Sequence, residues 1–153
     1  PYDWKWNEVM ETKNANGGAG FTEYNDGTIQ FETTQWSQGY YDNGKIWQTF
    51  TLPKGKYEMR IEVKNAANIG SGSTNIHFAV AQGESLPDNE ELEKSDIILS
   101  YLKFESEHTN KTSALPIFEL TEEKTITVGW VVSFSDICRN IEFKSVRLWS
   151  VAE

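Results

Sequence analysis

The sequence predicts an all-β protein, built as an antiparallel β-sandwich. Almost every periodic segment alternates apolar and polar residues with a period of two, turn signals recur about every 8–15 residues, and only one short segment has helical features. The chain has 153 residues, which is enough for one domain with a substantial core, and we find no internal repeat or linker. We therefore expect a single β-sandwich domain over residues 1–153.

The first elements are an aromatic edge strand and a hairpin. Aromatic residues alternate with polar ones over residues 2–6, which predicts an edge strand packed against the sandwich. An Asn-Asp-Gly turn then joins a short strand over 20–24 to a second strand over 28–34.

Residues 46–63 are the clearest hairpin of the chain, with a Pro-Lys-Gly turn between two alternating strands. The core side of the second strand carries four large apolar residues: Tyr57, Met59, Ile61 and Val63. The first strand is unusual, because Gln48 is predicted to lie inside with Ile46, while Trp47 is left on the outer face. An outward indole is a candidate for a functional contact.

The second half of the chain supplies the remaining strands. Alternation predicts strands over 75–81 and 125–134, and residues 97–104 are apolar on both faces, as in a strand covered on two sides. The last strand changes phase near Lys144 and Ser145, which predicts a β-bulge and turns Trp149 outward, unless it covers the N-terminal strand.

One segment has helical features, over residues 87–95. Acidic residues gather at its N-terminal end, as a helix dipole favours, and its length predicts a short surface helix between strands. Strands that return across the two sheets of such a sandwich give a jelly-roll topology.

Composition excludes several classes of function. The formal net charge is −9 and no cluster of Lys and Arg stands out, so we expect no nucleic-acid partner. No apolar run approaches the roughly 20 residues of a membrane-spanning helix. The single cysteine, Cys138, excludes a disulfide framework and is expected to be half-buried. Because the chain starts at Pro1 rather than Met, we expect it to be part of a longer exported protein.

Four sequence blocks carry a family resemblance. They are residues 46–49 (Ile-Trp-Gln-Thr), 52–57 (Leu-Pro-Lys-Gly-Lys-Tyr), 127–130 (Thr-Val-Gly-Trp) and 143–148 (Phe-Lys-Ser-Val-Arg-Leu). In this order they resemble a galactose-binding-like jelly roll, in which an aromatic-Gln strand leads through a Pro-x-Gly-x-Tyr turn and a Val-Gly-aromatic strand precedes the closing strand.

The chain also resembles a family of uncharacterised C-terminal domains in surface lipoproteins of gut bacteria that import polysaccharide. The matched blocks lie within residues 28–63 and 117–149. The resemblance implies a sandwich like that of carbohydrate-binding modules, without catalysis, located outside the cell or at the outer-membrane surface and joined to other domains of the same polypeptide. These motifs are mostly structural, so they specify the fold better than a ligand.

The segment over residues 36–47 has the composition of a sugar-binding loop. Aromatic faces cover the C–H side of a pyranose, while carboxylates and amides bind its hydroxyl groups. The candidate ligand-binding residues are Trp36, Tyr40, Tyr41, Asp42, Asn43 and Trp47. The alternative is that Trp36 and Trp47 only cover the ends of the sandwich and that residues 42–44 form a hairpin turn.

The sequence offers little for catalysis. His77 and His108 are the only histidines, and neither lies in a metal or nucleophile motif. His77 is predicted on the outer face of its strand, in solvent or under a loop. No carboxylate pair stands out among 23 acidic residues. We expect no enzyme and no cofactor, although galactose-binding-like modules often hold a structural calcium ion, for which the candidate ligands are the loop residues Asp26, Asp42 and Asp136.

Two hypotheses follow. The first is a non-catalytic module of a surface or secreted protein that binds a polysaccharide or oligosaccharide through loop aromatics. The second is a structural or protein-interaction domain that spaces other domains at the cell surface, with no ligand of its own. The second predicts that the chain itself, or a partner, covers the outward indoles.

Overall fold

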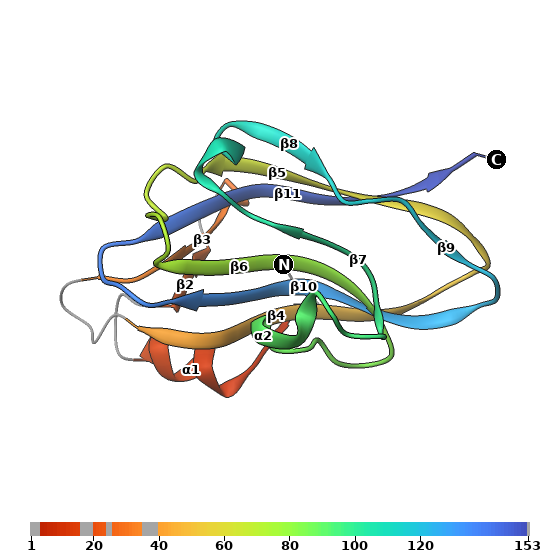
Figure 1. The fold of residues 1–153 in the computed structure, drawn as a ribbon, viewed down its shortest axis with the longest axis horizontal. Coiled ribbons are helices and arrows are strands. Elements are labelled where there is room, and N and C mark those ends of the chain that lie inside the picture. The colour runs from red at the N-terminus through yellow and green to blue at the C-terminus, as the bar shows by residue number, and fades with distance from the viewer. Residues whose placement is uncertain (1–3, 16–19, 24–25, 35–39, 153) are drawn as a thin grey trace.

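The computed structural model describes residues 4–15, 20–23, 26–34 and 40–152. Two antiparallel sheets pack face to face, and both α-helices lie on the side of the sandwich away from β5 and β8 (Figure 1). The predicted all-β sandwich is confirmed.

The first sheet has the strand order β1-β4-β10-β6-β7. Its strands are β1 (Lys5–Trp6), β4 (Tyr41–Leu52), β10 (Lys124–Phe134), β6 (Thr74–Gln82) and β7 (Ile98–Lys103). The second sheet has the order β2-β3-β11-β5-β8, and β9 also pairs with β5. Its strands are β2 (Gly20–Glu23), β3 (Ile29–Glu32), β11 (Asn140–Val151), β5 (Gly55–Asn65), β8 (Lys111–Ala114) and β9 (Phe118–Leu120). The helices are α1 (Glu8–Ala15), α2 (Asn89–Leu92) and the 3-10 turn η1 (Ser106–His108).

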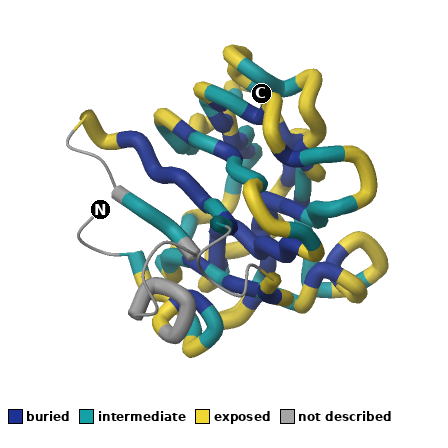
Figure 2. The backbone as a smooth tube through the Cα atoms, turned by 90° about the vertical axis from the view of Figure 1, so that its left-hand side faces the viewer, coloured by how far each residue is buried: buried dark blue, intermediate teal, exposed yellow. Residues whose placement is uncertain are grey.

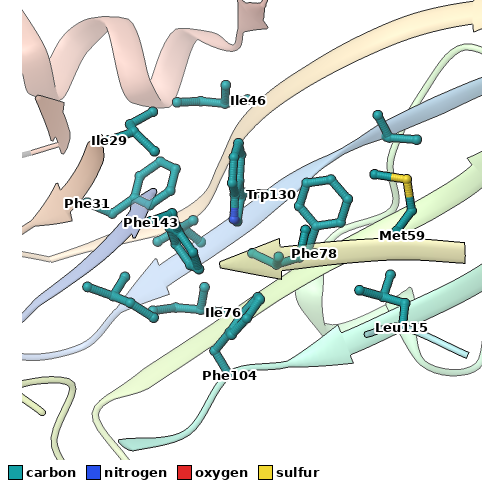
Figure 3. Packing of buried hydrophobic residues seen from close by; sticks show 14 of the residues in the cluster. Ile29, Phe31, Ile46, Met59, Ile76, Phe78, Phe104, Leu115, Trp130 and Phe143 are labelled. Atoms are coloured by element: carbon teal, nitrogen blue, oxygen red, sulfur yellow. The ribbon is translucent and has the colours of Figure 1, made fainter. Parts of the chain in front are cut away.

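The core between the sheets is built around Trp130 of the central strand β10. Its ring lies 5.0 Å from Phe78, 5.2 Å from Phe143 and 5.7 Å from Phe31, measured between centroids (Figure 3). Buried residues lie mostly within the strands, and many exposed residues lie in the connections; Figure 2 shows the burial of each residue along the chain. Alternation predicted this core correctly, since the inward residues of β5 and β10 are all buried.

The predicted bulge in β11 is confirmed, and it decides which side chains of that strand reach solvent. The pairing of β11 with β5 shifts register between Phe143 and Ser145. Phe143 points into the core before the shift, and Val146 and Leu148 pack against the core after it. Arg147 and Trp149, which alternate with Val146 and Leu148, therefore face outward.

Helix α1 corrects the prediction that only residues 87–95 are helical. Its N-terminus is capped by Asn7, whose Oδ1 accepts the Met10 amide at 3.3 Å and the Lys45 amide at 3.1 Å. Met10 is fully buried and lies over Gly44, where an added Cβ would be 2.1 Å from its sulfur. The helix is thus fixed to β4 by one capping residue and one buried side chain.

The segment over residues 83–97, which contains α2, covers the outer face of the first sheet. Leu86 and Leu92 are buried there against Ala79, Ala81 and Val131, in a second apolar cluster. The predicted short helix is therefore confirmed, and its function in the fold is to cover strands β6 and β10. None of the helices among the described residues is both long and apolar enough to cross a membrane.

Candidate functional site

Two of the predicted aromatic ligand residues are used for packing. Tyr41 is buried, with its ring edge-on to Phe134 at 5.3 Å, and burial raises the pKa of its hydroxyl well above the ordinary range. Trp47 lies on the outer face of β4, as predicted, but it packs against the second apolar cluster under residues 83–97. Trp36 lies outside the described residues.

Asn43 connects β4 to the covering segment. It has a positive φ of 55° and lies within β4, so residues 42–44 form neither a loop nor a hairpin turn. Its Oδ1 accepts the Asn89 amide at 2.7 Å, and its own amide donates to Ser133 Oγ at 2.9 Å. Of the six candidate residues, only Tyr40 and Asp42 are exposed among those described.

Asp42 borders a polar hollow of about 200 Å³ at this end of the sandwich. The other carboxylate at its rim belongs to Glu90, and the remaining lining is mostly hydroxyl and amide groups: Ser73, Thr74, Asn75, Ser133 and Ser135. Asn75 Oδ1 is buried and, among the described residues, has no hydrogen-bond partner. This hollow can offer a ligand hydrogen-bonding groups, but no exposed aromatic ring lines it.

His77 is covered by α2 rather than by solvent, and both of its ring nitrogens are bonded. Nδ1 lies 2.8 Å from Asn89 Oδ1, and Nε2 lies 2.9 Å from Glu93 Oε2. Asn89 Nδ2 donates to the carbonyl oxygen of Asn75 at 2.8 Å, which fixes Asn89 Oδ1 as an acceptor. The two hydrogen bonds of the His77 ring therefore tie α2 and Glu93, the residue that follows it, to β6.

The carboxylate that bonds to His77 Nε2 is exposed. The side chain of Glu93 is 50% accessible, whereas that of His77 is 1% accessible. The hydrogen bond from His77 is the main cause of a lowered pKa for the Glu93 carboxyl, and Tyr101 also donates to this group at 3.2 Å. The cluster can hold a helix in place, but the burial of His77 keeps its ring from a ligand.

A cavity of about 300 Å³ lies between the sheets and is chiefly apolar. Trp4, Ile29, Phe143 and Val146 supply much of its wall, together with Trp130, whose Nε1 has no hydrogen-bond partner among the described residues. A sugar placed there would leave most of its hydroxyl groups unpaired, at a cost of about 1–3 kcal/mol for each buried group. The chemistry of this wall does not suit a carbohydrate.

The outer face of β5 and β11 combines an exposed ring with polar groups. Trp149 is 46% exposed, and the Arg60 guanidinium lies 5.4 Å from its ring centroid. A hollow of about 200 Å³ beside it is lined by six residues of three neighbouring strands: Arg60, Glu62, Thr112, Ser145, Arg147 and Trp149. We call this set the β5–β11 face.

The strand register places these groups opposite one another. Arg147 is the cross-strand partner of Arg60, and Ser145 is the partner of Glu62. Ser145 Oγ donates to Glu62 Oε1 at 3.2 Å. The face therefore offers an indole, two guanidinium groups, a carboxylate and hydroxyls on rigid strands, which is the set of groups that binds a sugar ring and its hydroxyls.

Sequence reasoning missed most of this face. It identified Trp149 as an outward indole, and it is confirmed in that position, away from the N-terminal strand β1, which lies in the other sheet. Arg60 and Glu62 alternate with the core residues Met59 and Ile61, so the sequence pattern also indicates that they face solvent. The missing signal was the register of β11 against β5, which a local pattern does not contain.

The three predicted calcium ligands are used separately. Asp26 accepts hydrogen bonds from Thr28, which lower the pKa of its carboxyl, and Asp136 forms an ion pair with Arg139 at 2.9 Å. Asp42 lines the polar hollow. In the described ranges, no group of three or more His, Cys, Asp or Glu side chains is placed to hold a metal ion.

Comparisons with known proteins agree with this geometry at the level of the fold. The carbohydrate recognition domain of Emp47p has a TM-score of 0.58 and 10% identity, and the match covers 99% of this chain and 90% of that one. The K3 cleaved adhesin domain of Lys-gingipain from Porphyromonas gingivalis has a TM-score of 0.51 and 15% identity, with 99% and 93% covered. Among curated proteins, none matches the chain.

The fold is a two-sheet antiparallel β-sandwich, like that of the carbohydrate recognition domain of Emp47p. A family profile described as "Domain of unknown function (DUF5013)" matches residues 1–129. The chain belongs to this family.

Proposed function

We propose that the domain is a non-catalytic carbohydrate-binding module of a surface or secreted protein, and that the β5–β11 face is its binding site. The observation that carries the proposal is the exposed Trp149 ring beside a hollow with guanidinium, carboxylate and hydroxyl groups. The indole covers the C–H face of a sugar, while Arg147, Glu62 and Thr112 bind its hydroxyls. The likeness to a carbohydrate recognition domain supports the same class of ligand.

The position of this site suits an extended ligand. The described α-helices pack against the other sheet and against β2, so neither of them covers the outward side of β5 and β11 (Figure 1). A hollow of about 200 Å³ on an open sheet contacts one or two units of a chain that continues across the surface. An affinity in the millimolar range, about −4 kcal/mol, is expected for so few contacts.

Affinity-gel and glycan-array screening of the wild-type domain tests the proposal. The Trp149→Ala variant should lose binding by about tenfold or more, because a central aromatic contributes a large share of the energy of such a contact. Trp6→Ala is a matched control, since Trp6 is 45% exposed but lies in the other sheet. Equal binding by wild type and Trp149→Ala would reject the site, and no binding to any glycan would reject the function.

Two residues of the predicted sugar-binding segment, residues 36–47, form a second candidate site. Tyr40 is 60% exposed and Asp42 lines the polar hollow, so these two residues are proposed to contact sugar at the end of the sandwich. A Tyr40→Ala/Asp42→Ala double variant spares the buried Tyr41 and the partly buried Asn43 and Trp47, and it should therefore fold normally. Binding lost in this variant but kept in Trp149→Ala would place the ligand at the loop instead.

The structural or protein-interaction alternative also has an observation in its favour. Trp47, the first outward indole of the sequence, is covered by the chain's own residues 83–97. In that alternative the domain spaces its neighbours in a longer polypeptide, and Trp149 contacts a protein. A domain that binds no glycan, with Trp149 protected from acrylamide quenching only in the longer polypeptide, would establish that function.

A further inference from the structure

Two like charges face each other at the centre of the β5–β11 face, on a protein whose net charge is −9. Arg60 and Arg147 are direct cross-strand partners, and both are exposed. Like charges directly opposite on neighbouring strands destabilise a sheet. A pair of this kind needs negative charge nearby to offset the repulsion.

The protein compensates only one of these two cations. Arg60 Nε donates to Glu58 Oε1 at 2.6 Å, and its guanidinium lies over Trp149. Arg147 has neither an ion pair nor a hydrogen bond from its side chain to any described residue. The other carboxylate of the hollow, Glu62, accepts a hydrogen bond from Ser145. The Arg147 guanidinium therefore keeps its five donors for a ligand.

We propose that the glycan bound at this face is anionic, and that its negative group bridges Arg147 and the free nitrogens of Arg60. The inference rests on the proposed carbohydrate-binding function and names the class of sugar. A carboxylate of a uronic acid fits the planar fork of a guanidinium with two parallel hydrogen bonds, and a sulfate ester offers the same oxygen chemistry. The sugar ring then lies beside Trp149, within reach of Thr112 and Glu62.

The charge of the whole molecule makes this proposal specific. A protein with a net charge of −9 repels polyanions, so it does not bind acidic polymers nonspecifically, as a strongly basic protein does. Any affinity for an acidic glycan must come from a local arrangement of cations. The two guanidinium groups are also exposed to solvent, so salt should weaken their attraction for an anion.

The experiment measures binding of the whole domain to polygalacturonate, alginate and hyaluronate, to the carboxyl-reduced form of each, and to dextran sulfate beside dextran. We expect at least one uronate polymer to bind about tenfold or more tightly than its reduced form, as is typical for hydrogen bonds to a charged group. Binding should fall as NaCl rises from about 0.05 M to about 0.5 M. Arg147→Gln should abolish the preference.

Lys144→Gln is the matched control. It removes one positive charge from the same strand, but Lys144 borders the apolar cavity rather than the β5–β11 face. It should keep the preference for acidic polymers. An equal loss in Lys144→Gln and Arg147→Gln would show that only net charge matters, and would overturn the proposed bridge.

The remaining outcomes separate the two proposals. Binding to dextran sulfate alone keeps the anionic class and identifies sulfate as its source. Equal binding to acidic and neutral polymers, or binding to neutral polymers alone, overturns the anionic ligand and leaves the carbohydrate-binding function standing. Binding to none of these polymers and to no glycan of the array overturns both.

Discussion

At the scale of single residues, Gly129 shows how closely the strands of the first sheet approach. A Cβ at this position would lie 2.1 Å from the carbonyl oxygen of Ile46 and 2.7 Å from the Cα of Trp47. Both contacts are backbone atoms of β4, which cannot move without breaking the pairing of β4 with β10. Glycine in the Val-Gly-Trp motif is therefore needed for the close packing of β10 against β4.

Gly129→Ala should lower the free energy of unfolding by about 1–3 kcal/mol or more, because overpacking forces the backbone apart. Urea denaturation followed by tryptophan fluorescence measures the loss. Thr125→Ala, on an exposed position of the same strand, should change stability by no more than about 0.5 kcal/mol. A Gly129→Ala domain as stable as wild type would show that β4 and β10 can separate locally.

His77 provides a second residue-scale prediction. Its ring bonds to Asn89 and Glu93, so His77→Leu should leave these side chains without this partner and lower the free energy of unfolding by about 1–3 kcal/mol. Urea denaturation measures the loss. His108→Gln, in the 3-10 turn η1, where no residue is buried, is the control and should lose less. A His77→Leu domain as stable as wild type would contradict the anchoring of residues 83–97 by this ring.

At the scale of elements, the covering segment over residues 83–97 should respond to acid. The Glu93 carboxyl has a pKa lowered from 4.5 in the folded state, so the unfolded chain takes up its proton first as the pH falls. The stability that ionised Glu93 provides is fully present above the unfolded-state pKa of this carboxyl, about 4.5, and is lost as the pH falls through its lower folded-state pKa. The stability of the wild type should therefore drop on acidification through this window.

A Glu93→Gln variant tests this dependence. It keeps an acceptor for His77 but cannot titrate, so its stability should fall less steeply below about pH 4.5 than that of the wild type. Glu91→Gln is the control, since exposed Glu91 forms an ion pair with exposed Lys94, at 3.7 Å. Stability is measured by urea denaturation at several pH values. Parallel curves for Glu93→Gln and wild type would contradict the proposed link.

The elements also show what local sequence can and cannot predict. Strand β5 was predictable because its apolar residues alternate without interruption, and the bulge in β11 was predictable because that alternation changes phase. Helix α1 was not predictable from the sequence, since among its described side chains only Met10 is fully buried. Its stability depends on Asn7, which also bonds to Lys45, 38 positions away in sequence.

The candidate site follows the same rule. That Trp47 and Trp149 point outward could be predicted from the parity of their strands. The sequence could not predict that residues 83–97 cover Trp47 and leave Trp149 exposed, because this difference depends on contacts between distant segments. Cys138, predicted to be half-buried, is exposed with a φ of 57°, since the turn after β10 directs it outward.

At the scale of the whole molecule, the two sheets share one core and should unfold together. Ile126 of β10 and Ile61 of β5 are both fully buried in the same apolar cluster. Replacing either with alanine should cost about 2–5 kcal/mol. The domain alone, without neighbours, should show a single transition in urea whose midpoint shifts equally when followed by fluorescence or circular dichroism. Two separable transitions would show that the sheets are independent units.

The bulge between Phe143 and Ser145 has a consequence for how this surface can change. Because the side chains of a strand alternate, the core residues and the binding residues of β11 occupy the even and odd positions of one stretch of sequence. Substitutions can alter either set by itself. Losing or gaining one residue there would exchange the two sets, burying Arg147 and Trp149 and exposing Val146 and Leu148. New ligand preferences in this strand must therefore arise by replacement at constant length, whereas the loops remain free to vary in length.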